Sequence, residues 1–219
     1  MVEISTSLLG VKEENIIKTI YNLETAGTNY FHIDVMDGKF VEKDTIEIMR
    51  KYTEYIKQIA NTKTEAHLMV EDVDAFSKAY IDMGVNSIIF HIESCRNEEE
   101  VLKHISYIKK DGLQVGLSLN PNTSIEKLYN YLPYIHKVLV MTVEPGKGGQ
   151  ELIPETIEKI RNINKFSYEN GFDIDIEVDG GINAKTAKLA VDAGANILVS
   201  GSYIIKSNDY KTAIKNLRT

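Results

Sequence analysis

The sequence predicts a closed barrel of eight parallel β-strands alternating with α-helices, a (β/α)8 TIM barrel. Five times, an amphipathic stretch ends at a glycine shortly before an apolar strand; these glycines are Gly27, Gly84, Gly112, Gly171 and Gly194. Glycine readily adopts the left-handed conformation that ends many helices, so these positions indicate helix C-termini. Three further strands bring the number of strand–helix units to eight, and 219 residues suit a closed barrel of that size. A doubly wound open sheet is the alternative, but it usually needs fewer strands and leaves an edge.

In chain order, we expect strands over residues 2–8, 30–35, 63–69, 87–91, 114–119, 136–141, 173–178 and 197–200. The stretches between them carry apolar residues at helical spacing, beginning with Ile16 and Ile20. Thr123 followed by Glu126 predicts a capping box that opens a short helix. Because no linker-like tract interrupts this order, we expect one domain, residues 1–219.

The composition is that of an ordinary globular protein and excludes several classes. There are 25 Lys and Arg against 32 Asp and Glu, a formal net charge of −7, and 43% of residues are hydrophobic. No apolar run approaches the ~20 residues needed to span a bilayer, and an acidic chain without a basic run suits duplex nucleic acid poorly. Cys95 is the only cysteine, which excludes an internal disulfide and a cysteine-rich zinc site. We expect a cytoplasmic homo-oligomer without membrane or nucleic-acid partners.

Polar residues recur at alternate positions near the ends of three predicted strands. In such barrels function resides where each strand ends. Successive side chains of a strand point to opposite faces, and the apolar set must meet the outer helices, so the polar set points into the barrel. This inward set is His32, Asp34, His67, Glu177 and Asp179.

Burying these groups together is costly unless something compensates them, and a divalent cation is the simplest compensation. Two imidazoles and two carboxylates make a site suited to Zn, Fe(II), Mn or Co. The alternatives are solvent-facing residues of an antiparallel sheet, or unrelated buried polar pairs. His91 could join the pocket, although a single histidine is more often structural, and His104 and His136 are expected at the surface.

The loop from Glu144 to Gln150 contains three glycines within four residues and matches neither common nucleotide-binding motif. Its exposed backbone N–H groups suit an anion or a lid over a substrate, and a merely flexible turn is the alternative. Gly180-Gly181 and Gly201-Ser202 follow the last two predicted strands, where barrels of this type frequently bind phosphate, and they favour the anion.

With these motifs assembled, the sequence resembles the ribulose-phosphate 3-epimerase family along nearly its whole length. The resemblance is carried by residues 7–9, 32–41, 67–69, 141–150, 177–182 and 199–202. It implies a ribulose-phosphate-binding (β/α)8 barrel that interconverts D-ribulose 5-phosphate and D-xylulose 5-phosphate.

The resemblance also implies roles for individual residues. One divalent metal ion would be bound by His32, Asp34, His67 and Asp179, with Asp34 and Asp179 as the two acid/base groups. The expected substrate-binding residues are Ser7, His67, Gly146, Lys147, Gly148, Gly149, Gly180, Gly181, Gly201 and Ser202. Met36, Met69 and Met141 would line the space over the intermediate, although ordinary core packing is the alternative for each methionine.

Four departures from the family pattern are expected around the substrate mouth. The family usually has proline where Thr6 and Glu42 stand, a polar segment where Gly10-Val11 stands, and commonly an aromatic residue where Lys147 stands. They leave the expected reaction type intact and leave the exact sugar phosphate open, so a six-carbon ketose phosphate such as allulose 6-phosphate is the nearest alternative. A non-catalytic sugar-phosphate-binding barrel is a separate alternative. A sugar-phosphate decarboxylase on a related barrel is disfavoured. Such enzymes pair an aspartate with a lysine near the end of the second strand, whereas the corresponding face here carries His32, Asp34 and Met36 and no lysine.

Overall fold

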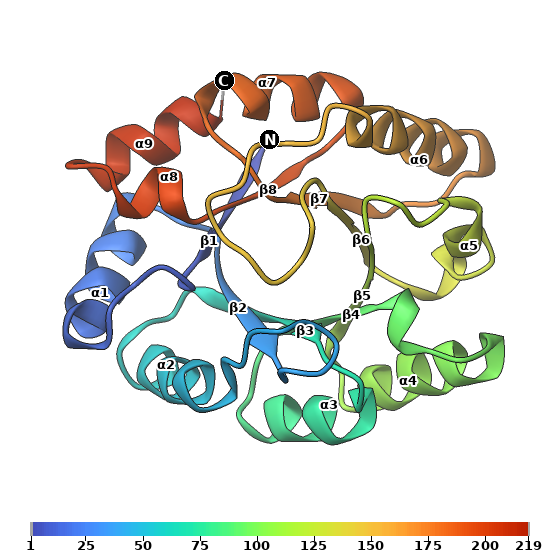
Figure 1. Cartoon of the computed structure of the whole chain (residues 1–219), viewed down its shortest axis with the longest axis horizontal. Coiled ribbons are helices and arrows are strands. Elements are labelled where there is room, and N and C mark those ends of the chain that lie inside the picture. Colours follow the sequence, from blue (N-terminus) through green and yellow to red (C-terminus); the bar gives the residue numbers. More distant parts are fainter. Residues whose placement is uncertain (1, 219) are drawn as a thin grey trace.

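The computed structural model describes residues 2–218, and its eight parallel strands close into a barrel in sequential order (Figure 1). The strands are β1 (Glu3–Ser7), β2 (Tyr30–Met36), β3 (Lys63–Met69), β4 (Ser87–His91), β5 (Gln114–Leu119), β6 (Lys137–Met141), β7 (Asp175–Asp179) and β8 (Ile197–Ser200). The predicted (β/α)8 barrel is therefore confirmed, and four of its strands have the predicted bounds. The other four differ from the prediction by one or two residues at an end.

Helices surround the barrel and cover the outer faces of its strands (Figure 1). They are α1 (Ile16–Ala26), α2 (Ile46–Ile59), α3 (Val73–Asp82), α4 (Glu98–Lys110), α5 (Glu126–Tyr129), α6 (Thr156–Asn170), α7 (Ala184–Ala193), α8 (Ser202–Ile205) and α9 (Tyr210–Leu217). Single 3₁₀ turns occur at Glu13–Asn15, Ile92–Ser94 and Leu132–Tyr134. No described helix is long and apolar enough to cross a membrane.

The five predicted helix-stop glycines all have positive φ, as the helix-stop interpretation requires. The prediction of a capping box at Thr123 is wrong. Thr123 donates its hydroxyl hydrogen to Glu93, and α5 begins at Glu126 without a side-chain cap. Glu93 follows β4 and draws the hydroxyl away from the helix, so a tertiary contact replaces the local one.

As predicted, strand alternation directs one set of side chains toward the outer helices and the other set into the barrel. Ile33 and Val35 of β2 point outward into the apolar layer between barrel and helices. Inside the barrel, inward apolar residues such as Leu139 of β6 and Val199 of β8 lie on either side of the polar residues of β7. Strands β2 and β3 add further polar residues to the same interior. The candidate site residues therefore lie inside the barrel beside apolar neighbours.

The expectation that His104 is a surface residue is wrong. Its side chain is buried, with Nδ1 2.8 Å from a carboxylate oxygen of Asp74 and its ring edge-on to Phe90. His104 falls on the same α4 stripe as Val101 and Ile105, and this helical spacing could have revealed its burial. His136 is only partly buried.

Candidate metal and substrate site

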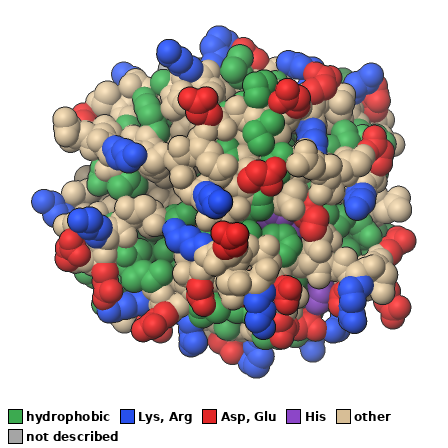
Figure 2. Space-filling view, in the orientation of Figure 1, with side chains coloured by type: hydrophobic (Ala, Val, Ile, Leu, Met, Phe, Trp, Pro, Cys, Tyr) green, Lys and Arg blue, Asp and Glu red, His purple; other side chains and the backbone are tan. Residues whose placement is uncertain are grey.

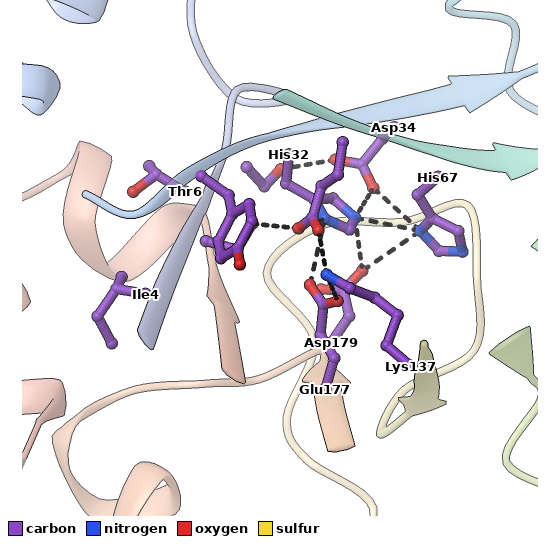
Figure 3. Close-up of polar contacts among 12 residues, drawn as sticks. Ile4, Thr6, His32, Asp34, His67, Lys137, Glu177 and Asp179 are labelled. Carbon is purple, nitrogen blue, oxygen red and sulfur yellow. Dashed lines mark hydrogen bonds and ion pairs between the residues drawn. The ribbon is translucent and has the colours of Figure 1, made fainter. Parts of the chain in front are cut away.

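Four side chains converge at one point inside the barrel, and we call them the quartet: His32, Asp34, His67 and Asp179. Residue pairing across the sheet places Asp34 of β2 beside His67 of β3, while Asp179 ends β7 (Figure 3). His32 Nε2 lies 3.2 Å from His67 Nδ1, 3.6 Å from Asp34 Oδ1 and 3.8 Å from Asp179 Oδ2. His67 Nδ1 lies 3.7 Å from the same Asp34 oxygen and 3.8 Å from the same Asp179 oxygen.

These spacings fit a metal ion. The four inward ligand atoms all lie within 4.8 Å of one another. A regular tetrahedron with edges of 3.2–3.8 Å, the nitrogen–nitrogen and nitrogen–oxygen distances given above, has its corners about 2.0–2.3 Å from its centre. This matches the bond lengths of zinc to imidazole nitrogen and carboxylate oxygen. Two nitrogens and two oxygens are also a donor set suited to Fe(II), Mn and Co. The quartet could therefore hold one divalent cation.

The charges of the quartet are strongly coupled. Although burial opposes it, the nearby Asp34 and Glu65 carboxylates raise the pKa of His32 to about 10. Burial lowers the pKa of His67 to about 4. Burial and repulsion by Asp34 raise the pKa of Asp179 to about 7. Burial opposes ionisation of Asp34 as well, but the nearby His32 and His67 rings and a hydrogen bond from Ser7 hold its pKa below its ordinary value. The two carboxylates thus differ in their affinity for a proton.

A second chain of contacts lies behind His67. Its outer nitrogen, Nε2, is 2.9 Å from His91 Nε2, and His91 Nδ1 is 3.2 Å from a Glu93 carboxylate oxygen. Glu93 also accepts hydrogen bonds from the Asn120 backbone N–H and the Thr123 hydroxyl. His91 thus supports His67 from behind and is fully buried.

The inward glutamate Glu177 does not belong to the quartet and lies on the other side of His32. It is buried with Glu65 and Lys137, a set that we call the floor cluster, and Lys137 Nζ donates hydrogen bonds to both carboxylates (Figure 3). Burial and repulsion by Glu65 raise the pKa of Glu177 to about 8. Sequence reasoning missed Lys137, although its position on the same face of β6 as Leu139 and Met141 was a signal that it points inward.

Above the quartet, a cavity of about 340 Å³ opens at the ends of the strands. Its lining includes both aspartates of the quartet and most residues predicted to contact substrate or intermediate, which are Ser7, Met36, Met69, Met141, Gly146, Lys147, Gly148, Gly149, Gly180, Gly181, Gly201 and Ser202. His67, also predicted to contact substrate, is fully buried behind this lining. The cavity is therefore continuous with the quartet through Asp34 and Asp179.

The expectation that all departures from the family pattern surround the mouth is wrong. Gly10 and Lys147 line the cavity, and Glu42 does not. Thr6 lies on the outer face of β1, where its hydroxyl oxygen is 2.7 Å from that of Thr28 (Figure 3). Strand alternation explains this placement, because Ser5 and Ser7 occupy the inward positions on either side.

The wall opposite the quartet is made of loop backbone. A Cβ at Gly180, where φ is +122°, would come 2.4 Å from Val143 Cγ2. A Cβ at Gly181, where φ is +65°, would come 2.4 Å from the Leu152 backbone nitrogen. The N–H groups of Gly180, Gly181 and Gly201 donate hydrogen bonds to no other described residue. These N–H groups are therefore available to an anion at the mouth.

The loop between β6 and α6 crosses the mouth of the barrel (Figure 1). Figure 2 shows positive and negative side chains interspersed over this face. An anionic ligand would thus meet local N–H groups and single lysines rather than an extended basic patch.

Comparisons with known proteins agree with this site. A sequence model of the ribulose-phosphate 3 epimerase family matches residues 3–205. The ribulose-phosphate 3-epimerase of Methanocaldococcus jannaschii is 41% identical over 218 residues, which covers 100% of this chain and 90% of that protein. The chain belongs to the ribulose-phosphate 3-epimerase family. The ribulose-phosphate 3-epimerase of Bacillus subtilis is 35% identical over 219 residues, covering 100% and 99% of the two chains. The prediction of an enzyme of the ribulose-phosphate 3-epimerase family is confirmed.

Solved structures support the fold of this family member. The crystal structure of KGPDC from Streptococcus mutans superposes with a TM-score of 0.73 at 10% identity, covering 100% of this chain and 96% of that chain. A 3-hexulose-6-phosphate synthase from Salmonella typhimurium gives 0.71 at 14% identity, with 98% and 96% covered. At these identities the likeness shows the barrel fold alone.

Proposed function

We propose that this protein is a metal-dependent epimerase that inverts C3 of a ketose phosphate, interconverting D-ribulose 5-phosphate and D-xylulose 5-phosphate. Membership of the family and the names of its relatives support the reaction. The observation that carries the mechanism is the convergence of Asp34 and Asp179, from β2 and β7, on the base of one cavity.

Inversion at C3 requires removal of a proton beside the C2 ketone and delivery of a proton to the opposite face of the planar enediolate. Two acid/base groups that come from different strands, and so reach the bound substrate from different directions, would satisfy this requirement. Asp34 lies near the end of β2 and Asp179 ends β7, and both line the cavity, so one carboxylate can accept the C3 proton while the other delivers one. In the reverse direction the two aspartates exchange these tasks.

The four residues of the quartet would hold the metal ion. A divalent cation there would supply electrophilic stabilisation of the negative charge that develops on the C2 oxygen. Zn, Fe(II), Mn and Co all suit the donor set. The Ser7 hydroxyl donates a 2.6 Å hydrogen bond to Asp34 Oδ2, and thereby orients this carboxylate at the edge of the cavity.

The rest of the cavity would hold the substrate. The free N–H groups of Gly180, Gly181 and Gly201 would bind the phosphate, with Ser202 and Lys147 nearby. Met36, Met69 and Met141 would exclude water from the face of the intermediate, because their side chains are apolar and lie beside the aspartates. A small phosphorylated ketose is therefore the substrate class. The expected homo-oligomer stays a prediction.

The test is a coupled epimerase assay on protein purified without chelator, together with metal analysis of the same sample. We expect turnover of D-ribulose 5-phosphate and incorporation of solvent deuterium at C3. A strong preference for a hexulose 6-phosphate such as D-allulose 6-phosphate would replace the proposed substrate. If the metal-loaded protein exchanged no C3 proton with any ketose phosphate, a non-catalytic sugar-phosphate-binding role would replace the epimerase.

A further inference from the structure

The floor cluster buries a lysine in the centre of the barrel. Lys137, Glu65 and Glu177 are all 0% exposed. Lys137 Nζ lies 2.6 Å from Glu65 Oε2 and 2.9 Å from Glu177 Oε2, so one ammonium group bridges two carboxylates (Figure 3). Burying such a group is costly unless its charge and its hydrogen bonds are matched, and an apolar residue would fill the same space more cheaply.

Neighbouring residues provide the space for this lysine. Gly116 of β5 pairs with Lys137 in the sheet, and a Cβ at Gly116 would come 2.8 Å from Lys137 Cγ and 2.9 Å from Ile89 Cγ1. The ring of Tyr30 also lies 4.7 Å from Nζ, where it can attract the ammonium charge. The aliphatic stem therefore follows a path that exists because residue 116 has no side chain.

The floor cluster is hydrogen-bonded to the quartet through Glu65. Glu65 Oε1 accepts hydrogen bonds from His32 Nδ1, at 2.9 Å, and from the Ser5 hydroxyl, while Oε2 is held by Lys137. A carboxylate that accepts from Nδ1 keeps a proton on that nitrogen, so the other nitrogen, Nε2, faces the quartet. Nε2 is the His32 atom that lies within 4 Å of Asp34, His67 and Asp179.

A second carboxylate lies within reach of His32. Glu177 Oε1 is buried, has no hydrogen-bond partner among the described residues and lies 3.7 Å from His32 Nδ1. Glu65 and Glu177 are thus two candidate acceptors for one N–H group. Lys137 donates hydrogen bonds to the Oε2 atoms of both carboxylates. In this arrangement Glu65 is the nearer acceptor for His32 Nδ1, at 2.9 Å against 3.7 Å for Glu177.

We propose that Lys137 is a positioning residue for the metal site. By bridging Glu65 and Glu177 it fixes Glu65 behind His32, and so sets the direction in which His32 Nε2 points into the quartet. Lys137 acts through Glu65 and touches neither metal nor substrate. The inference rests on the proposed metal site. Loss of a residue that supports a metal ligand commonly changes the metal affinity of a site by about 10–100-fold.

The test measures metal binding rather than turnover. Purified wild-type protein and the variants Lys137→Met, Lys137→Met/Glu177→Gln and Glu65→Gln are titrated with Co²⁺ against a competing chelator, and the visible absorption of bound Co²⁺ is recorded. The double variant removes the ammonium group together with one of the two carboxyl groups that it contacts, and it tests the proposal if the single lysine variant fails to fold. Lys63→Met is the matched control, because the exposed Lys63 lies near the same Tyr30 ring, 5.4 Å from its centre.

We expect about a 10–100-fold loss of Co²⁺ affinity in the floor-cluster variants and an altered Co²⁺ absorption spectrum, with the control unchanged. Folded double and Glu65→Gln variants that bind Co²⁺ with wild-type affinity and spectrum would show that the cluster serves stability alone, and would overturn the proposal. If wild-type protein itself bound no Co²⁺, the proposed metal site would fail instead, so the two failures are distinguishable.

Discussion

The two walls of the cavity are built differently. The proposed metal wall consists of side chains from β2, β3 and β7, and the buried Glu65 and His91 contact its two histidines from behind. The proposed phosphate wall consists of backbone N–H groups in loops after β6, β7 and β8, where glycines such as Gly180 and Gly181 allow close approach. Proton transfer and metal binding need specific functional groups at fixed positions, whereas anion binding needs N–H donors and sufficient space. The metal wall should therefore respond to changes in charge, and the phosphate wall to changes in volume.

The largest expected effect is the loss of either acid/base group on the metal wall. Asp34→Asn and Asp179→Asn should each lower kcat/KM by about 10³-fold, because an amide cannot carry the C3 proton and is a weaker metal ligand. The coupled assay measures the rate, and deuterium incorporation at C3 should fall in parallel. The exposed Asp192→Asn on α7 is the control. A variant of either quartet aspartate that kept about a tenth of the wild-type kcat/KM would contradict the assignment.

Removal of the metal tests the same wall without changing the chain. Dialysis against a chelator should lower kcat by at least about 100-fold, since the charge developing on the substrate oxygen then lacks its electrophile. Adding back Co²⁺ or Zn²⁺ should restore activity, with metal content measured on each sample. Full activity in protein shown to be free of metal would rule out the proposed cofactor.

On the phosphate wall, added volume should affect binding more than chemistry. Gly180→Ala places a Cβ 2.4 Å from Val143 Cγ2, which must displace the loop after β7. We expect KM to rise by about 10-fold or more, because misplacing a binding group by an ångström can cost two orders of magnitude. Gly112→Ala is the matched control, because φ there is also positive, at +78°, but the new Cβ would meet nothing within 4 Å among the described residues.

Gly112→Ala should lose about 1 kcal/mol of stability from backbone strain, and Gly180→Ala should lose more because of its added clash with Val143; urea unfolding measures both. Steady-state kinetics should separate them. Equal KM values in the two variants would show that the volume at Gly180 does not matter to substrate.

The smallest expected effect concerns the support behind His67. Burial opposes ionisation of Glu93, but His91 and hydrogen bonds from Thr123 and Asn120 lower its pKa to about 2. A lowered folded-state pKa contributes stability above the unfolded value of 4.5, and this contribution disappears as pH falls towards 2. Glu93→Gln should therefore destabilise the protein by on the order of 2 kcal/mol at about pH 7 and by much less near pH 3.

Urea unfolding at both pH values measures this difference for wild type and variant. The exposed Glu99→Gln on α4 is the control and should show little change at either pH. A destabilisation by Glu93→Gln that stayed constant with pH would show that the charge of Glu93 is not its source.

Much of the metal wall could be predicted from the sequence. The period of two along a strand placed His32 and Asp34 on one face, and the order of strands in a closed barrel brought that face near His67 and Asp179. The family motifs pointed to the same residues. The glycine-rich loops at the cavity could also be located, because in such barrels the loops after the last strands lie at the same mouth as the other strand ends, and their binding of phosphate stays a prediction.

The connections behind these residues depend on the three-dimensional structure. Lys137 is 72 residues from Glu65 and 40 from Glu177, and alternation alone shows that a side chain points inward but not which groups it meets there. The same reason explains Thr123, whose hydroxyl binds Glu93, 30 residues away, instead of capping α5. Local periodicity selects the face of a strand or helix, whereas barrel closure selects the partner across it, because that partner is set by the register of several strands at once.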